Sequence, residues 1–428
     1  MKFRKLTMAA VGSVATAFGL SAPAAATEAV FTEVAREFVN NVGSLNAEVP
    51  VALSDDGKVV FAAKSLPANV DGLFAWQAGT LTPINLAAGG YTQVNSVAVR
   101  SAGDVAFVAR REAGATDFRG VYRTSTSAGA VTTLREEPIA IPGDPSGPSP
   151  RFVAMSENGT VAYSTIVDGG PGAIYRGPVG GAQPVLRSGS GTFFNTQRLD
   201  VNNAGQVAVQ MEHTSPVMGL SRGILVFETP EQPLASTKSA IEQLSVAIQP
   251  MPSINSAGQV AFSLNSTATM KFYNPPNNSG GTLIDTVTLT PGVYVVTPAG
   301  YGLPRTYTQI ANNAGLFNTF DRVRINDAGM VVFEANLDGG GATSGLYTGG
   351  NPLTDKVIGQ GDTIGTTFVS ILELGELNNS NQFTFYTSDF ISTDRQVWLA
   401  TVPEPACGAV LLITGVLAAC RPRQRRVN

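Results

Sequence analysis

The chain has 428 residues, of which 43% are hydrophobic and only 14% are charged, with 46 glycines and 26 prolines. This balance suits a large β-rich globular protein better than a disordered or a helical one. Seven of the 28 basic residues lie in the two terminal segments, so the long segment between them has an excess of acidic residues. Such a segment will not bind nucleic acid or anionic lipid by charge alone.

Residues 1–26 have the order of features found in a secretory signal peptide. Three basic residues precede an apolar run over residues 8–20, and Ala24 and Ala26 offer the small side chains that a signal peptidase requires. We therefore expect this segment to be removed and the rest of the chain to be exported. A buried N-terminal helix is the alternative.

Residues 29–37, "AVFTEVARE", follow the expected cleavage site. We predict that they form the outermost strand of the last repeat unit described below and so close a ring. Val30, Val34 and Phe38 are four residues apart, so a short amphipathic helix is the alternative.

One octapeptide recurs seven times between residues 50 and 400. The copies are "SDDGKVVF" (54–61), "RSAGDVAF" (100–107), "SENGTVAY" (156–163), "NNAGQVAV" (202–209), "NSAGQVAF" (255–262), "NDAGMVVF" (326–333) and "NNSNQFTF" (378–385). Periods of about 40 to 55 residues are typical of propellers and other repeat arrays. The fourth positions of the copies are Gly57, Gly103, Gly159, Gly205, Gly258, Gly329 and Asn381.

Each octapeptide predicts a tight hairpin corner followed by a buried strand. An Asn or Ser at the first position can hydrogen-bond the backbone two residues further on, and the glycine supplies the positive φ of a type I turn with a G1 bulge. Asn381 fits, because asparagine tolerates this region better than other non-glycine residues. Past the corner, large apolar residues flank a small one, as in Val105, Ala106 and Phe107, so we expect both faces of the strand to be buried.

Two further strands recur in most units. One is seen at "GLF" (72–74), "GVY" (120–122), "AIY" (173–175), "GILVF" (223–227), "GLY" (345–347) and "QVW" (396–398), and a weaker one at "LTPINL" (81–86), "AVTTLRE" (130–136), "QPVLRS" (183–188) and "DKVIGQ" (355–360). With the strand entering each corner this makes four strands in about 50 residues, which is typical of one propeller blade. The sequence predicts an all-β fold, a seven-bladed β-propeller of four-stranded antiparallel blades over residues 27–401.

The fifth unit is the longest and leaves two questions open. Its second strand is either "KFY" (271–273), which has the right offset, or "GVY" (292–294), which has the better sequence. A corner-like "NNAGLFNT" (312–319) lies just before a well-formed corner, and we interpret it as an inserted hairpin or loop rather than an eighth blade. The corner motif also resembles bacterial surface proteins with a tandem N-x-x-G-x-x-A-F repeat, a resemblance that implies architecture and no activity; the copies at 54, 100 and 156 lack the leading Asn.

Residues 402–428 form a distinct terminal segment. Fifteen uncharged residues would rise about 22 Å as a helix, short of the roughly 30 Å hydrocarbon core of a bilayer. Basic residues after such a run stay in the cytoplasm, so we expect an exported body held transiently in the inner membrane. The run is flanked by Pro403, Glu404 and Pro405 before it and Arg421, Arg423, Arg425 and Arg426 after it.

These flanking residues resemble the PEP-CTERM sorting signal of Gram-negative bacteria. The resemblance implies removal of the tail by an exosortase-like enzyme and a link to biofilm and extracellular polysaccharide. An ordinary tail anchor is the alternative.

The body between the two ends offers little catalytic chemistry. Both cysteines, Cys407 and Cys420, lie in the tail, and His213 is the only histidine, expected in a surface loop just after a strand. A thiolate nucleophile, a disulfide and a multi-histidine metal site are therefore excluded from the body. We predict no catalytic, cofactor or metal site.

Two sets of residues are weighed as binding or catalytic candidates. Paired acids suffice for glycoside cleavage, but acids in corners usually cap turns; those considered are Asp55, Asp56, Asp327 and Glu334. Aromatic side chains in loop-like surroundings could stack on sugar rings; those considered are Trp76, Tyr91, Tyr301 and Tyr307.

The sequence thus predicts an exported, non-enzymatic binding or scaffolding module of the cell envelope or extracellular matrix. Its processing partners would be signal peptidase and an exosortase-like enzyme, with polysaccharide as a possible ligand and no nucleic acid. A propeller enzyme that acts on polysaccharide through carboxylates is the alternative.

Overall fold

The computed structural model describes residues 28–403 with internal gaps, and this part of the chain contains 33 β-strands. The gaps are residues 47–48, 67–69, 85, 87–88, 115, 128, 140–148, 168–169, 182–184, 189–192, 216–218, 228–238, 244–250, 275–281, 298–305, 339–342 and 389–394. Both terminal segments predicted to be processed, 1–26 and most of 402–428, lie outside the described residues. No described helix is long and apolar enough to cross a membrane.

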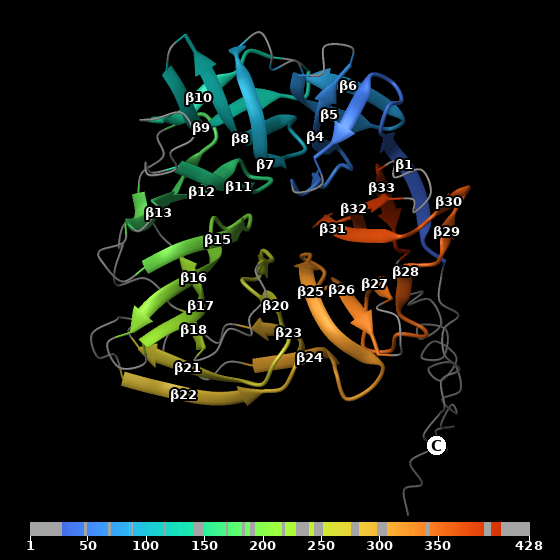
Figure 1. Cartoon of the computed structure of the whole chain (residues 1–428). Helices are drawn as coiled ribbons and strands as arrows, with labels where there is room; N and C mark the ends of the chain where they lie inside the picture. Colours follow the sequence, from blue (N-terminus) through green and yellow to red (C-terminus); the bar gives the residue numbers. More distant parts are fainter. Residues whose placement is uncertain are drawn as a thin grey trace, which may run out of the picture. The chain divides into compact units, whose positions relative to one another are not determined.

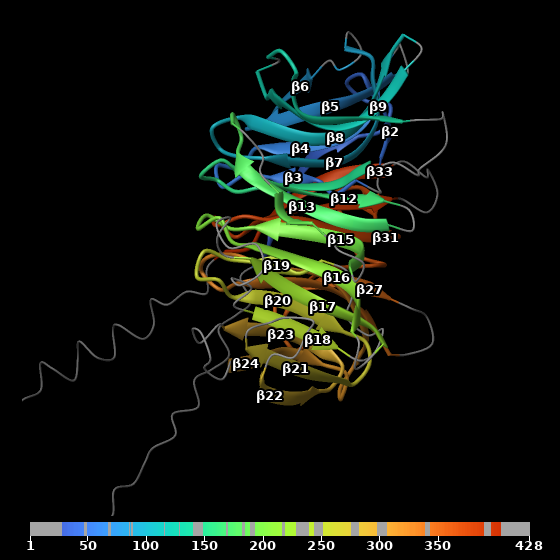
Figure 2. The same ribbon diagram turned by 90° about the vertical axis from the view of Figure 1, so that its left-hand side faces the viewer.

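The described strands form antiparallel sheets arranged in a ring, which is a β-propeller (Figure 1). Figure 2 shows the same ring from the side. The first three large sheets contain β2 (Val42–Leu45), β3 (Ala52–Leu53), β4 (Val59–Ser65), β5 (Val70–Gln77) and β6 (Thr80–Ile84); β7 (Tyr91–Val99), β8 (Asp104–Ala113), β9 (Thr116–Ser125) and β10 (Thr132–Ile139); and β11 (Ser149–Met155), β12 (Thr160–Val167), β13 (Gly170–Pro178) and β14 (Val185–Ser188).

The next two sheets are joined by an insertion. The fourth contains β15 (Phe193–Val201), β16 (Val207–Ser215), β17 (Gly219–Phe227) and β18 (Ser239–Gln243), extended by β21 (Ala268–Asn274) and β22 (Thr282–Leu289). The fifth contains β19 (Ser253–Ile254), β20 (Val260–Leu264), β23 (Gly292–Thr297) and β24 (Thr306–Asn312).

The last two large sheets complete the ring. The sixth contains β25 (Phe317–Ile325), β26 (Val331–Leu337), β27 (Ser344–Tyr347) and β28 (Lys356–Gly359), and a small hairpin of β29 (Thr363–Ile364) and β30 (Thr367–Phe368) follows it. The seventh contains β31 (Ile371–Leu377), β32 (Gln382–Ser388), β33 (Arg395–Thr401) and β1 (Val30–Arg36). The all-β propeller and its recurring strands are confirmed, and most of these sheets have four strands.

Each octapeptide forms the predicted corner between the innermost strand of a sheet and the second strand. The six corner glycines have φ between +75° and +87°, and Asn381 has φ +56°. At the fourth corner the Gly205 N–H donates to Asn202 O at 2.9 Å and the Asn202 N–H donates to Gln206 O at 3.1 Å. This pair of bonds is that of a type I turn with a G1 bulge, as predicted.

The corners are also linked to one another by their polar side chains. Asn202 Nδ2 donates to Asn255 O at 2.7 Å, Asn255 Nδ2 to Asn326 O at 3.1 Å, and Asn326 Nδ2 to Asn378 O at 3.1 Å. Asn378 Nδ2 then donates to Ser54 O at 2.9 Å, which joins the last corner to the first. All four asparagines are buried.

Other bonds complete the circle where the first position is not asparagine. The Asp56 N–H donates to Ser101 Oγ at 3.1 Å, the Ser101 N–H to Glu157 Oε2 at 2.7 Å, and the Asn158 N–H to Asn203 Oδ1 at 3.3 Å. Every corner is therefore hydrogen-bonded to the next, and we call this circle the corner ring.

Within its own corner, a first-position asparagine or serine accepts from the backbone four residues on, rather than only two as we expected. Asn255 Oδ1 accepts from the Gln259 N–H at 3.0 Å, and Ser54 Oγ accepts from the Lys58 N–H at 3.0 Å. The bond thus spans the whole turn and ties its two ends together. Only Asn378 accepts from both positions, Ser380 N–H and Gln382 N–H.

The strands that leave the corners are buried on both faces, as predicted. In each unit, the second, third and fourth residues after the corner's Gly or Asn form a triplet, such as Val105, Ala106 and Phe107. Every residue of the seven triplets is at most 3% exposed. In the second sheet, Val105 and Phe107 pack in a cluster with the first sheet, while Ala106 packs with residues of the third. Each sheet is therefore held between two neighbours, and apolar burial stabilises the whole circumference.

The ring closes through the N-terminal strand. β1 pairs antiparallel with β33, in a register that runs from Val30 opposite Thr401 to Arg36 opposite Gln396. Val34 and Ala35 lie at a bulge in this pairing and are buried. The predicted strand over residues 29–37 is confirmed, and the alternative helix is wrong.

In the fifth unit, the second strand is the one that contains "GVY" (292–294). β20 pairs with β23, which contains residues 292–294, whereas residues 271–273 belong to β21 in an inserted hairpin. That hairpin joins the outer edge of the fourth sheet through β18. The corner-like "NNAG" begins at Asn312, the last residue of β24, and continues into the connection to β25; these two strands do not pair with each other, so the interpretation as a loop is confirmed.

Two of the "Asn-x-Ala-Gly" sequences, at 312–315 and 326–329, offer a direct test of the corner geometry. A Cβ added at Gly329 or at Gly315 would meet no atom within 4 Å, but only Gly329 has a positive φ, +82°. Gly329→Ala should therefore lower the free energy of unfolding by about 1–2 kcal/mol, whereas Gly315→Ala should change it by less than about 0.5 kcal/mol. Equilibrium denaturant unfolding of both variants measures this difference, and equal losses would contradict it.

Candidate functional site in the central cavity

The innermost strands of the seven large sheets line a central cavity of about 160 Å³. This space is large enough for several water molecules or one small organic molecule. The corner ring lies at the same cavity, because residues of six of the seven corners also line it.

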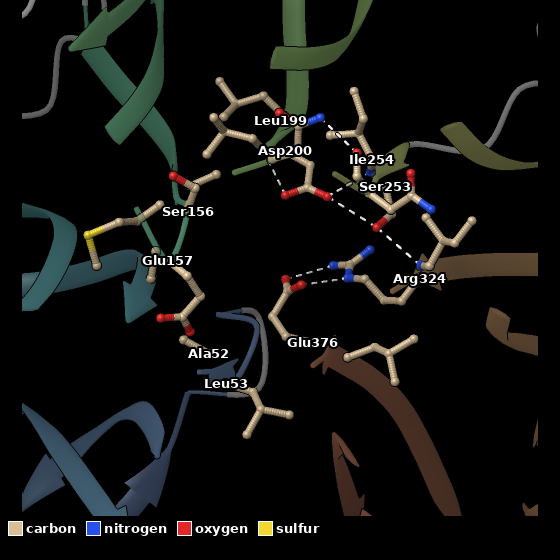
Figure 3. Close-up of a pocket in the computed structure, with 18 of the residues that line it drawn as sticks. Ala52, Leu53, Ser156, Glu157, Leu199, Asp200, Ser253, Ile254, Arg324 and Glu376 are labelled. Carbon is tan, nitrogen blue, oxygen red and sulfur yellow. Dashed lines mark hydrogen bonds and ion pairs between the residues drawn. The ribbon is translucent and has the colours of Figure 1, made fainter. Parts of the chain in front are cut away.

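Seven equivalent positions define the wall of this cavity. They lie two residues before the first residue of each corner, and all seven line it: Ala52, Ala98, Ala154, Asp200, Ser253, Arg324 and Glu376. The first three sheets contribute only alanine and the last four contribute polar or charged side chains. The cavity therefore has an alanine wall and a polar wall, and in Figure 3 the four polar side chains point toward one another.

Asp200 is held by donors from its own chain. Its Oδ2 accepts from the Ile254 N–H at 2.9 Å and from Ser253 Oγ at 3.1 Å, and its Oδ1 accepts from the Val201 N–H at 2.8 Å. Burial, followed by the negative charge of Glu376, nevertheless raises the pKa of Asp200 to about 6. Asp200 therefore changes its protonation state near pH 6.

Arg324 and Glu376 form a bidentate ion pair across two sheets. Arg324 Nε donates to Glu376 Oε2 at 2.8 Å and Nη2 donates to Oε1 at 2.9 Å. Although burial works against it, the Glu376 carboxylate raises the pKa of Arg324. Both oxygens of Glu376 are thus engaged by one guanidinium in the planar geometry that arginine favours.

Arg198 has a different environment. Its Nη1 donates to Met251 Sδ at 3.1 Å, and its guanidinium lies 5.7 Å from the centre of the Phe152 ring. Arg324 Nη2 approaches the same sulfur at 3.6 Å, and Met251 has a φ of +118°, which is rare for a residue with a side chain. Burial, followed by the positive charges of Arg322 and Arg324, lowers the pKa of Arg198 to about 9.

The acids singled out in the sequence serve the structure of the corners. Asp55 Oδ1 accepts from the Asn379 N–H at 2.9 Å and Asp327 Oδ1 from the Ser256 N–H at 2.6 Å, so both belong to the corner ring. Asp56 accepts from Ser54 Oγ at 2.6 Å and pairs with Lys58. The acids of the ring therefore cap a neighbouring corner, whereas Asp56 caps its own.

Glu334 has an unusual protonation behaviour but lies outside the cavity lining. It is partly buried on β26, where its Oε2 accepts from the Leu374 N–H at 3.4 Å. Burial, with a further contribution from the charge of Asp321, raises the pKa of Glu334 to about 7.

The aromatic and histidine candidates are placed differently from our expectations. Trp76 and Tyr91 lie in β5 and β7 and are buried, and Tyr307 lies in β24, so loop-like surroundings were the wrong prediction for all three. Tyr301 is outside the described residues. The backbone of His213 lies within β16, paired with Phe193 and Ser221, rather than in a loop after a strand.

Among the described residues, no group of three histidines, cysteines or acids is placed to hold a metal ion. The polar wall itself was missed from the sequence, because Asp200, Arg324 and Glu376 occur in ordinary strand contexts. Aligning the seven units on their corners would have found it, since the position two before the corner is alanine in three units and polar in four.

Comparisons with known proteins concern the family and the fold. The sequence signature described as "Family of unknown function (DUF7453)" matches residues 9–263 and 232–415. No curated protein matches the chain.

Solved structures with a similar fold are distant. The β-propeller domain of the trilobed protease from Pyrococcus furiosus is 10% identical with a TM-score of 0.44, over 83% of this chain and 97% of that one. Polysaccharide lyase Uly1 is 9% identical with a TM-score of 0.46, over 87% of this chain and 97% of that one. Prolyl oligopeptidase B from Galerina marginata is 11% identical with a TM-score of 0.47, over 84% of this chain and 49% of that one, so the chain spans about half of its length. These resemblances carry no inference about activity.

The raised pKa of Glu334 predicts a pH-dependent stability. The folded protein keeps this proton up to about pH 7, whereas an unfolded glutamate releases it near pH 4.5, so the free energy of unfolding falls as pH rises through this window. Glu334→Gln removes the titration and should be more stable than the wild type at pH 8 by about 1–3 kcal/mol. The two proteins should converge near pH 4.5.

Denaturant unfolding between pH 4.5 and pH 8 measures this difference, with Glu112→Gln, an exposed acid of another sheet, as the control. A constant difference between Glu334→Gln and the wild type across this range would contradict the prediction.

Proposed function

The chain belongs to DUF7453, a family of unknown function, and we propose that it is a non-enzymatic binding or scaffolding module, exported to the cell surface or extracellular matrix. The seven corners, one in each large sheet, support a count of seven blades for its propeller.

This proposal rests on one observation: the repeated polar side chains form hydrogen bonds between the corners. The first-position asparagines are buried and bonded to the next corner, and Asp55, Glu157 and Asp327 accept from backbone N–H groups of other corners. Groups committed in this way hold the ring together and are not available to a substrate. The repeat is therefore a scaffold, whose specificity lies in residues that differ between units.

Export is proposed from the two terminal segments. Residues 1–26, with Ala24 and Ala26 at the cleavage site, would be removed by signal peptidase. The segment 402–428, with Pro403, Glu404 and Pro405 before its apolar run and arginines after it, would hold the body in the inner membrane until an exosortase-like enzyme removes it.

A carboxylate-dependent enzyme acting on polysaccharide is the second candidate, and one observation favours it. Asp200 and Glu376 line the same cavity, and burial holds the pKa of Asp200 at about 6 while Glu376 is paired with Arg324. An acid with a raised pKa in the same cavity as a second acid is a recurrent arrangement for acid–base catalysis.

Binding and cleavage are separated by one experiment on residues 28–403, which form a compact unit that contains the whole ring. The protein is incubated with immobilised neutral and acidic polysaccharides, and both the retained protein and new reducing ends are measured. We expect retention on at least one polysaccharide without release of reducing ends.

Retention on none would contradict the binding role. Release of reducing ends that Glu376→Gln abolishes would contradict the non-enzymatic role. Glu373→Gln is the matched control, because it removes a carboxylate of the same strand that pairs with Arg322 outside the cavity lining.

A further inference from the structure

The charged side chains of the cavity are already engaged within the protein. Those that the innermost strands contribute each bond to another group of the chain, and they are Arg198, Asp200, Arg324 and Glu376. Those that the corners contribute each accept from a backbone N–H of another corner, and they are Asp55, Glu157 and Asp327. These are all the charged side chains that line the cavity in the described part of the chain. A charged ligand would therefore have to displace an existing partner.

Backbone groups of the innermost strands also face the cavity. Arg100 closes its corner by donating its N–H to Asp104 O at 3.2 Å, and Val99, one residue earlier, lies opposite Val105. Because hydrogen-bonded and non-hydrogen-bonded pairs alternate in an antiparallel ladder, the N–H and C=O groups of Val99 point away from β8. They point to the cavity, since β7 is the innermost strand of its sheet and Val99 lines the cavity. The equivalent residues of the other sheets also line it: Leu53, Met155, Val201, Ile254, Ile325 and Leu377.

The polar wall supplies acceptors for its own inward-facing N–H groups. Asp200 accepts from the Val201 and Ile254 N–H groups, and Ser253 Oγ accepts from the Ile325 N–H at 3.3 Å (Figure 3). Asp200 and Ser253 thus each bind the N–H of the following sheet.

The alanine wall has no side chain that can do this. Ala52 and Ala98 stand where Asp200 and Ser253 stand in their own sheets, and a methyl group accepts no hydrogen bond. Among the described residues, no group accepts from four of the seven inward-facing N–H groups, those of Leu53, Val99, Met155 and Leu377. Backbone N–H groups are strong donors that are nearly always paired, so these four are open to an acceptor on a ligand.

The alanine wall therefore combines backbone donors and acceptors with an apolar surface. Leu53, Val99 and Met155 each offer an N–H and a C=O, and the methyl groups of Ala52, Ala98 and Ala154 lie between them. A sugar ring matches this combination, because each hydroxyl both donates and accepts while the C–H groups of the ring pack on an apolar surface.

We propose that the central cavity binds one neutral monosaccharide unit, whose hydroxyls bond to the backbone of Leu53, Val99 and Met155 while its ring packs on the alanine wall. The cavity volume of about 160 Å³ suits one such unit, either a free sugar or the end of a polysaccharide. This inference rests on the proposed binding role and names its ligand class.

The test is calorimetric titration of residues 28–403 with D-glucose, D-galactose, D-mannose and D-glucuronate. At least one of the three neutral hexoses should bind saturably. It should bind more tightly than D-glucuronate, because the carboxylate would enter a cavity whose charged groups are already partnered.

Ala98→Ser tests the role of the backbone donors with little change in volume. The new hydroxyl should accept from the Met155 N–H, as Ser253 Oγ accepts from the Ile325 N–H. Hexose binding should weaken about threefold to tenfold, which is the effect of losing one hydrogen bond. Ala102→Ser is the matched control, since Ala102 is an exposed residue of the corner that follows and does not line the cavity.

Ala154→Leu tests the space instead of the hydrogen bonds. Leucine should fill the volume beside the alanine wall and weaken hexose binding tenfold or more. Thermal unfolding close to that of the wild type shows for both variants that the loss belongs to the site.

The outcomes separate this inference from the proposed function. No saturable binding of any hexose, or tighter binding of D-glucuronate, would overturn the inference even if polysaccharide is retained elsewhere on the surface. Hexose binding that Ala98→Ser leaves unchanged would also overturn it. Hexose binding that both variants weaken, without retention on any polysaccharide, would keep the site for a free sugar and overturn the broader role. Release of retained protein by the free hexose would assign the site to polysaccharide ends.

Discussion

The hydrogen bond from the amide of one corner asparagine to the backbone of the next corner is the interaction on which this propeller depends. Asparagine serves two corners at once, because its Oδ1 caps the turn in which it lies and its Nδ2 reaches the carbonyl of the following corner. Serine, found at two of the other corners, accepts the first bond, but its single O–H donates within the same corner, to Asp56 or to Asn158, and does not reach the next corner. The repeated sequence therefore encodes the turn and the contact between sheets together.

The ring is not uniform, and its two parts differ in both the corners and the cavity. The corners that begin with Ser54, Arg100 and Ser156 belong to the sheets that contribute the alanine wall, while the four that begin with asparagine belong to the sheets of the polar wall. Asparagine links support the innermost strands that place Asp200, Arg324 and Glu376. The four sheets with asparagine corners thus hold the charged side chains of the polar wall, for which exact placement matters most.

Local sequence patterns allowed much of the fold to be predicted, whereas features that depend on long-range contacts could not be predicted from the sequence. A glycine with positive φ followed by alternating large and small apolar residues is compatible with few structures other than a tight turn and a buried strand. The corners, the buried strands and the closing strand near Val34 could therefore be predicted. Tyr91 was misplaced because polar residues separate it from the apolar end of its strand, whereas Trp76 keeps the period of two with Phe74 and could have been placed in the strand. The pairing of Arg324 with Glu376 joins residues 52 positions apart, and no local pattern in the sequence indicates it.

The stability of an asparagine variant tests the corner ring most directly. Asn255→Ser keeps an acceptor for the Gln259 N–H but cannot reach Asn326 O, which would then be buried without this donor. If the ring depends on these links, Asn255→Ser lowers the free energy of unfolding by about 1–3 kcal/mol, and Asn255→Ala lowers it further. An Asn255→Ser protein as stable as the wild type in equilibrium denaturant unfolding would contradict the account.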